Sequence, residues 1–205
     1  MPIIKAVIYD FDGVIVDSRE ANRVYYNRIL AHFGLPPLIP DQMETVQTRT
    51  SREVIAQLLA APHLVQAAQE LEKRLSNDDI IPLIRLEPYV RETLSALKKR
   101  YRTAIATNRG KSLPLVLQHH SLAGYFELIV SSAQVQHPKP HPEYLERILQ
   151  AFSLTPAQAV YIGDAELDAQ LAAAAGVPFL AYKNPDLQAW AHLADHRDIW
   201  RVLDF

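Results

Sequence analysis

A short segment near the N-terminus, apolar on both faces, constrains the fold more than any other feature of the sequence. Residues 3–9 read Ile-Ile-Lys-Ala-Val-Ile-Tyr, so apolar side chains fall on both sides of an extended chain. Strands of this kind are typical of parallel sheets, in which helices cover each face. The sequence therefore predicts a buried central strand and an α/β fold.

Similar runs recur along the chain and alternate with helical patterns. The further expected strands cover residues 103–106, 128–130, 159–162 and 177–182. Pro178 stands at the start of the last run, which favours an edge position for that strand. The alternation predicts a Rossmann-like, mostly parallel sheet with helices on both faces.

The stretch 19–84 breaks this alternation, because it contains only helical patterns. One of them begins at Thr50 with capping-box spacing to Glu53. We therefore expect residues 1–18 and 85–205 to form the sheet domain. Residues 19–84 are expected to form a small all-helical domain inserted after the first strand.

Composition excludes several classes of protein. The 205 residues include no Cys, which excludes a disulfide scaffold and any cysteine-ligated metal site. Lys and Arg number 21 against 23 Asp and Glu, so no general basic field favours nucleic acid as a partner. No window approaches the roughly 20 apolar residues of a membrane helix, and the N-terminus lacks the pattern of a signal peptide. We expect a cytoplasmic protein that binds neither nucleic acid nor membrane.

Acidic side chains follow two of the expected strands. Asp10 and Asp12 end the first strand, and their i, i+2 spacing points both carboxylates the same way, about 6–7 Å apart. Asp164 ends the fourth strand, and Asp168 follows one helical turn later on the same side. Oxygen-only ligands of this kind suit Mg²⁺. The alternative is that the acids simply favour a helix N-terminus, an interpretation we accept for Glu166.

Two polar residues and one lysine occupy equivalent places after other strands. Thr107 and Asn108 can donate hydrogen bonds to an anion, although an ordinary helix N-cap is the alternative. Lys139 stands among three prolines, which lower the entropic cost of holding its ammonium in place, whereas the alternative is a solvated loop lysine. All of these positions lie where open α/β sheets bind ligands, at the carboxyl ends of strands.

Two histidines flank the lysine. His137 and His141 could be read as metal ligands. The absence of Cys, and of any carboxylate at helical spacing beyond Glu143, disfavours that interpretation.

Four stretches resemble, in order, the signature motifs of the haloacid dehalogenase superfamily, and most of all its phosphoglycolate-phosphatase-like and β-phosphoglucomutase-like subgroup. They are Asp-Phe-Asp-Gly-Val-Ile-Val-Asp-Ser (10–18), Ala-Thr-Asn-Arg (106–109), Lys-Pro-His-Pro-Glu (139–143) and Gly-Asp-Ala-Glu-Leu-Asp (163–168). The helical insert resembles the C1-type cap of that group. The chain departs from the pattern at Ala165, often Ser, near Thr48, where a Gly is often found, and at Tyr89, which replaces the usual Gly after Pro.

The resemblance implies a role for each motif residue in the catalytic core domain. Asp10 is implied as the nucleophile that forms an aspartyl-phosphate, and Asp12 as the general acid and then the general base. Lys139 is implied to neutralise the nucleophile and the transferred phosphoryl group, and Thr107 and Asn108 to bind substrate. The implied Mg²⁺ ligands are Asp10, the backbone carbonyl of Asp12, and Asp164, with Asp168 bracing the metal's waters or Lys139.

These roles together predict a Mg²⁺-dependent phosphomonoester hydrolase acting on a small phosphorylated metabolite, as a monomer or homodimer. A phosphomutase of the β-phosphoglucomutase type is the alternative, and a non-catalytic binding protein on the same fold is a further one. A true haloacid dehalogenase is disfavoured, because those enzymes lack the second acid, Asp12. In the helical insert, Arg49, or failing that Arg52, is expected to contact the non-phosphate part of the substrate, the alternative being a solvated arginine beside a helix start.

Overall fold

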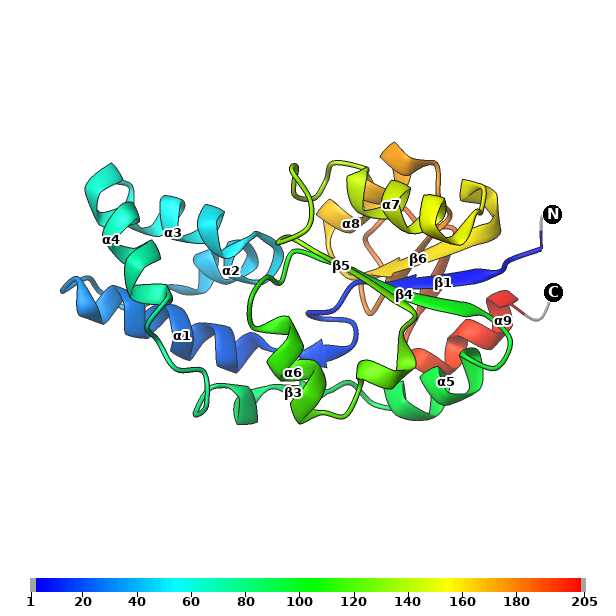
Figure 1. Cartoon of the computed structure of the whole chain (residues 1–205), viewed down its shortest axis with the longest axis horizontal. Helices are drawn as coiled ribbons and strands as arrows, with labels where there is room; N and C mark the ends of the chain where they lie inside the picture. The colour runs from blue at the N-terminus through cyan, green and yellow to red at the C-terminus, as the bar shows by residue number, and fades with distance from the viewer. Residues whose placement is uncertain (1–2, 204–205) are drawn as a thin grey trace.

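The computed structural model describes residues 3–203 and is built around one parallel sheet (Figure 1). Its six strands lie in the order β5-β4-β1-β6-β7-β8, and every neighbouring pair is parallel. The strands are β1 (Ala6–Tyr9), β4 (Arg102–Thr107), β5 (Leu128–Ser131), β6 (Ala159–Gly163), β7 (Phe179–Tyr182) and β8 (Ala191–Leu193).

Strand β1 lies in the middle of the sheet and is buried on both faces, as its sequence predicts. Val7 and Tyr9 pack into the apolar cluster on one face, and Ala6 and Ile8 into the cluster on the other. The first cluster includes side chains of α5 (Val90–Leu97), α6 (Leu113–His119) and α9 (Trp200–Leu203), and the second includes those of α7 (Glu143–Phe152) and α8 (Glu166–Ala175). The expected α/β class with helices on both faces is confirmed.

The expected position of the 177–182 segment is wrong. Strand β7 is an interior strand, hydrogen-bonded to β6 on one side and to β8 on the other. Pro178 precedes the first paired residue, Phe179, so its missing N–H costs the ladder nothing, and its carbonyl accepts a hydrogen bond from the N–H of Tyr161. The edge on this side is formed by β8, which sequence analysis did not include.

The segment that follows β1 is helical. It contains α1 (Arg19–His32), α2 (Met43–Thr48), α3 (Ser51–Leu59) and α4 (Pro62–Glu72), and these helices pack around an apolar cluster of their own. Short 3₁₀ turns complete the chain: η1 (Pro40–Gln42), η2 (Ile81–Leu83), η3 (Ala123–Tyr125), η4 (Pro156–Gln158) and η5 (His196–Ile199). Figure 1 shows α1 to α4 beside the sheet rather than on either of its faces. Within residues 3–203, no helix is long and apolar enough to cross a membrane.

The two chain segments that connect the helical segment to the sheet run side by side. Strand β2 (Val16–Asp17) leads into α1, and β3 (Arg85–Leu86) leads back toward α5. The two pair antiparallel, with Val16 opposite Leu86 and Asp17 opposite Arg85. The helical segment is thus joined to the sheet through one two-stranded crossing.

Candidate active site

Three carboxylates from two neighbouring strands and the following helix meet at the carboxyl end of the sheet. Asp10 directly follows β1, Asp164 directly follows β6, and Asp168 lies in the first turn of α8. One carboxylate oxygen from each of the three residues lies within 4.8 Å of the other two. The adjacency of β1 and β6 brings together acids that are more than 150 positions apart in sequence. The structure therefore brings these three predicted site residues together, and their role as metal ligands stays a prediction.

The lysine of the proline-rich loop is buried among these acids. The side chain of Lys139 is 3% exposed, and its Nζ lies 2.5 Å from Asp10 Oδ1 and 2.8 Å from Asp168 Oδ1. The Nζ also donates to the hydroxyl of Tyr161 at 2.6 Å, and that hydroxyl donates to Asp168 Oδ1 at 2.7 Å. Asp168 and Tyr161 therefore hold the lysine against Asp10.

Tyr161 is a site residue that sequence analysis did not identify, since it was assigned only to a buried strand. The one signal available was a hydroxyl in an otherwise apolar stretch of β6. A buried tyrosine hydroxyl requires a hydrogen-bond partner, and in this strand the partners are the lysine and the carboxylate.

Asp12 faces a different partner. Its carboxylate accepts hydrogen bonds from Arg109 Nη2 at 2.6 Å and Nε at 2.9 Å, and from Ser18 Oγ at 2.5 Å. Arg109 also donates to Ser112 Oγ at 2.9 Å and to Asn22 Oδ1, in α1, at 3.4 Å. The sequence predicts no role for Arg109, because nothing in its position reveals that it pairs with an acid 97 residues away.

The two polar residues after β4 differ in how they are engaged. Thr107 is buried, lines the cavity, and its hydroxyl oxygen accepts a hydrogen bond from the N–H of Arg109. The amide oxygen of Asn108 accepts from Tyr144 Oη at 2.8 Å, and its amide nitrogen donates to the carbonyl of Thr48 at 2.9 Å. Asn108 therefore links the sheet to α2, and its expected contact with substrate stays a prediction.

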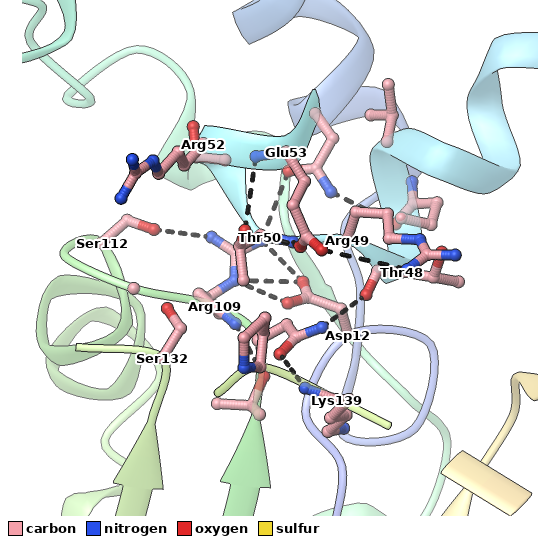
Figure 2. A pocket seen from close by; sticks show the side chains of 18 of the residues that line it. Asp12, Thr48, Arg49, Thr50, Arg52, Glu53, Arg109, Ser112, Ser132 and Lys139 are labelled. Atoms are coloured by element: carbon pink, nitrogen blue, oxygen red, sulfur yellow. Dashed lines mark hydrogen bonds and ion pairs between the residues drawn. The ribbon is translucent and has the colours of Figure 1, made fainter. Parts of the chain in front are cut away.

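A cavity of about 540 Å³ lies over these residues, between the sheet and the helical segment (Figure 2). The helical segment contributes the run from Thr48 to Glu53, around the start of α3. Thr50 caps that helix by accepting from the N–H of Glu53, while the Glu53 carboxylate accepts from the N–H of Thr50, so the expected capping box is present. Arg49 and Arg52 both line the cavity. The Nη1 atom of Arg49 lies 3.9 Å from Oε1 of Glu53.

Two glycines leave the space that the acids occupy. A Cβ atom on Gly13, where φ is +83°, would lie 2.1 Å from Asp164 Oδ2. A Cβ atom on Gly163 would lie 2.3 Å from the Cβ of Asp168. Both distances are far below van der Waals contact, so any larger residue would displace an acid of the cluster.

The cluster holds more negative than positive charge in a buried place. Burial raises the pKa of Asp10 to about 7, against the opposing attraction of Lys139. Burial, with repulsion from Asp168 and Asp10, raises the pKa of Asp164 well above its usual range. Burial disfavours the ammonium of Lys139, but the attraction of Asp10 and Asp168 outweighs this and raises its pKa.

This electrostatic pattern fits a cation-binding site. One ammonium faces three carboxylates, and burial raises the pKa values of Asp10 and Asp164 in spite of the attraction of Lys139. A divalent cation beside them would supply further positive charge. The donors are oxygens only, which suits a hard ion such as Mg²⁺.

Comparisons with known proteins agree with this site. Residues 7–182 match the family described as haloacid dehalogenase-like hydrolase. A phosphoglycolate phosphatase of Rhodobacter capsulatus is 31% identical, over 94% of this chain and 92% of that protein. The fructose-1-phosphate phosphatase YqaB of Escherichia coli is 29% identical, over 83% and 92% of the two chains. Among solved structures, a subfamily IA hydrolase of this superfamily from Geobacter sulfurreducens is 40% identical, with a TM-score of 0.79 over 98% of this chain and 96% of that one.

Proposed function

The chain belongs to the haloacid dehalogenase-like hydrolase family, and on this basis we propose that it is a phosphatase that releases phosphate from a small phosphorylated metabolite. The observation that carries the proposal is the convergence of Asp10, Asp164 and Lys139 at the floor of one cavity. Catalysis of phosphoryl transfer consists almost entirely of positioning the reacting groups in line and stabilising charge. Asp10 supplies the nucleophile and Lys139 a positive charge, and Asp164 would help to hold a divalent cation.

The proposed reaction begins at Asp10. Its carboxylate attacks phosphorus and forms an aspartyl-phosphate, while the leaving alcohol takes a proton from Asp12. Water then hydrolyses the aspartyl-phosphate, with Asp12 as the base that takes the water's proton. Lys139 and the hydroxyl of Thr107 bind the phosphoryl oxygens throughout. Asp10, Asp164 and the backbone carbonyl of Asp12 would hold Mg²⁺, with Asp168 bracing its waters or Lys139, and the bound ion would supply further neutralisation of charge.

Asp12 can perform this role only after it leaves Arg109. In the structure, both of its carboxylate oxygens accept hydrogen bonds from the guanidinium. An arriving phosphate carries more negative charge than a carboxylate and binds a guanidinium in the same forked geometry. The proposed function therefore includes an exchange of partners, in which substrate phosphate competes with Asp12 for Arg109.

The residues of the helical segment that line the cavity support a role for residues 19–84 as the cap. We assign to this cap the choice of substrate, because a site that recognises only phosphate cannot distinguish one phosphomonoester from another. Closing lids of this kind also exclude water from the reacting groups.

The proposal is tested by measuring phosphate release from a panel of phosphorylated metabolites and from p-nitrophenyl phosphate at fixed Mg²⁺. We expect release from both, with one metabolite class clearly preferred. An isomerised sugar phosphate without released phosphate would indicate the phosphomutase alternative. No reaction with any compound would leave the non-catalytic alternative and end the proposal.

Removal of divalent cations is expected to silence the enzyme, and added Mg²⁺ to restore it. The carboxylates of the cluster repel one another unless a cation lies among them. Asp164→Ala is expected to raise the Mg²⁺ concentration for half-maximal activity at least tenfold, whereas the exposed Asp186→Ala is the control and should leave it unchanged. Full activity in excess EDTA would contradict the metal assignment.

Arg49 is proposed to contact the non-phosphate part of the substrate, because it belongs to the cap (residues 19–84) and lines the cavity. Arg49→Ala is expected to lower kcat/KM at least tenfold for the preferred metabolite and to leave the value for p-nitrophenyl phosphate within about twofold. Arg23→Ala, an exposed arginine outside the cavity, is the matched control. Equal losses on both substrates, or none on either, would reject the assignment.

A further inference from the structure

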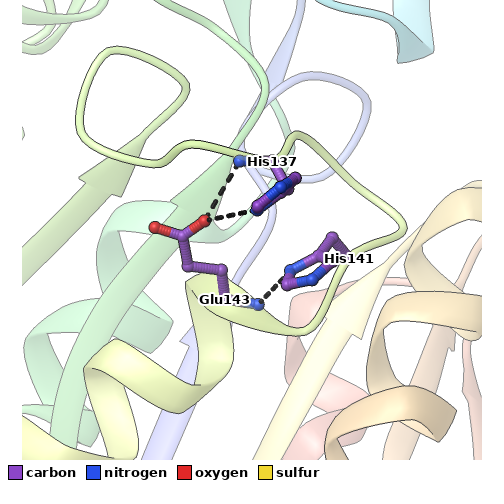
Figure 3. Close-up of side chains that lie close together, drawn as sticks. All are labelled: His137, His141 and Glu143. Carbon is purple, nitrogen blue, oxygen red and sulfur yellow. Dashed lines mark hydrogen bonds and ion pairs between the residues drawn. The ribbon is translucent and has the colours of Figure 1, made fainter.

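The loop that carries Lys139 also brings two histidines and a glutamate together on its outer side (Figure 3). His137 and His141 are exposed, and Glu143 is the first residue of α7. One nitrogen from each ring and one carboxylate oxygen lie within 4.8 Å of one another. Pro138 and Lys139 line the cavity of the candidate active site, whereas His137, His141 and Glu143 do not.

The separation of these ligand atoms approaches that of a metal site. Zinc binds histidine nitrogen and carboxylate oxygen at about 2.0–2.2 Å, so two ligand atoms in a tetrahedral site lie about 3.3 Å apart. The Nδ1 atom of His137 lies 3.5 Å from Oε2 of Glu143. This pair therefore requires almost no movement to share an ion.

The second histidine already directs a lone pair to the same side. Its ring stacks on that of His137, with centroids 4.4 Å apart and planes inclined by 29°. The Nδ1 atom of His141 accepts a hydrogen bond of 3.3 Å from the backbone N–H of Glu143. That N–H is at a helix N-terminus, where it has no partner within the helix and can bind water instead. An ion could thus replace this long hydrogen bond at small cost.

Backbone contacts hold the glutamate and the loop in this arrangement. The Glu143 carboxylate accepts from the N–H groups of Gln136 at 2.9 Å and His137 at 3.0 Å, and from Arg147 Nε at 3.1 Å. The N–H of His141 donates to the carbonyl of Pro138 at 3.1 Å. The two backbone N–H groups bind Oε2, the oxygen that faces His137, and Arg147 binds Oε1. Hydrogen bonds to a ligating carboxylate orient it in a metal site, and a preorganised loop loses little entropy on binding.

We propose that His137, His141 and Glu143 bind a divalent transition-metal ion at a surface site separate from the acidic cluster. Two imidazoles and one carboxylate favour zinc and its neighbours nickel and copper over magnesium, with water completing the coordination. Three prolines and Lys139 lie within the same seven residues. Binding therefore joins the two ends of the loop whose centre positions Lys139 against Asp10.

Zinc binding is measured by competition with a chromophoric chelator, on the full chain without a histidine tag. Excess Mg²⁺ keeps zinc from the acidic cluster. We expect one equivalent of zinc to bind the wild type and to raise its Tm. His141→Ala and Glu143→Gln are each expected to weaken binding at least tenfold and to remove the rise in Tm. His63→Ala, an exposed histidine in α4, is the matched control and should behave as wild type.

Two results would overturn the proposal. One is a wild type that binds no zinc in excess Mg²⁺. The other is zinc binding that His141→Ala and Glu143→Gln leave unchanged, which would place the ion elsewhere. Circular dichroism of each variant shows whether the chain remains folded. None of these readouts depends on phosphate release, so they are independent of the proposed phosphatase activity.

Discussion

Asp10→Asn is expected to reduce turnover at least a hundredfold and to leave the protein folded. The amide nearly matches the carboxylate in size but cannot attack phosphorus. A hundredfold loss corresponds to about 2.7 kcal/mol of transition-state stabilisation. Phosphate release under saturating Mg²⁺ measures the loss, and thermal unfolding measures the fold.

The matched control for this variant is Asp41→Asn, an exposed aspartate in η1 outside the cavity. It makes the same chemical change and should leave turnover unaltered. If the turnover of Asp10→Asn stays above about one hundredth of the wild-type value, the loss of transition-state stabilisation is less than about 2.7 kcal/mol. That result would exclude Asp10 as the nucleophile.

Lys139→Met is expected to lower the free energy of unfolding by about 3–5 kcal/mol at pH 8, because it leaves buried carboxylates without their cation. It also removes the attraction that lowers the pKa of Asp10, which is about 7 with the lysine present, so the pKa of Asp10 rises further in the variant. The folded state of the variant then binds more protons than the unfolded state, so its stability falls as pH rises through that pKa. Urea unfolding in EDTA at pH 5.5 and pH 8 should show a larger deficit at pH 8.

Lys73→Met provides the comparison. Lys73 pairs with Glu70 at the surface, with both side chains 55% exposed, and removal of such a pair changes stability by at most about 1 kcal/mol. If Lys139→Met is no more destabilised than Lys73→Met, the buried pairs of Lys139 contribute little. If its deficit is the same at both pH values, Asp10 does not titrate as described.

Local patterns in the sequence predict most of this fold. The apolar strand at β1, the helical stretch after it and the polar residues at strand ends are each determined by neighbouring residues, so they can be recognised without a structure. Parallel pairing then places the ends of β1, β4 and β6 at one edge of the sheet, which is why Asp10, Thr107 and Asp164 could be grouped in advance.

Features that depend on distant pairs could not be predicted in this way. The ion pair of Arg109 with Asp12 joins different elements, and nothing local to either residue specifies it. Strand β8 has three residues, too few for a recognisable pattern. Where the family usually has Gly after Pro88, Tyr89 adopts a left-handed φ of +63°, and the Arg197 guanidinium stacks on its ring at 3.7 Å. The missing Gly was visible in the sequence, but the stacked arginine was not.

The two glycines beside the acidic cluster affect how this activity should be recognised in other proteins. Gly13 and Gly163 provide no ligand and carry no charge, yet each leaves a space that an aspartate fills. A related chain could retain every acid and the lysine, exchange one of these glycines for alanine, and still be unable to assemble the cluster. A search for active relatives should therefore require both glycines along with the charged residues, and a chain lacking either one should be tested for activity before the function is transferred to it.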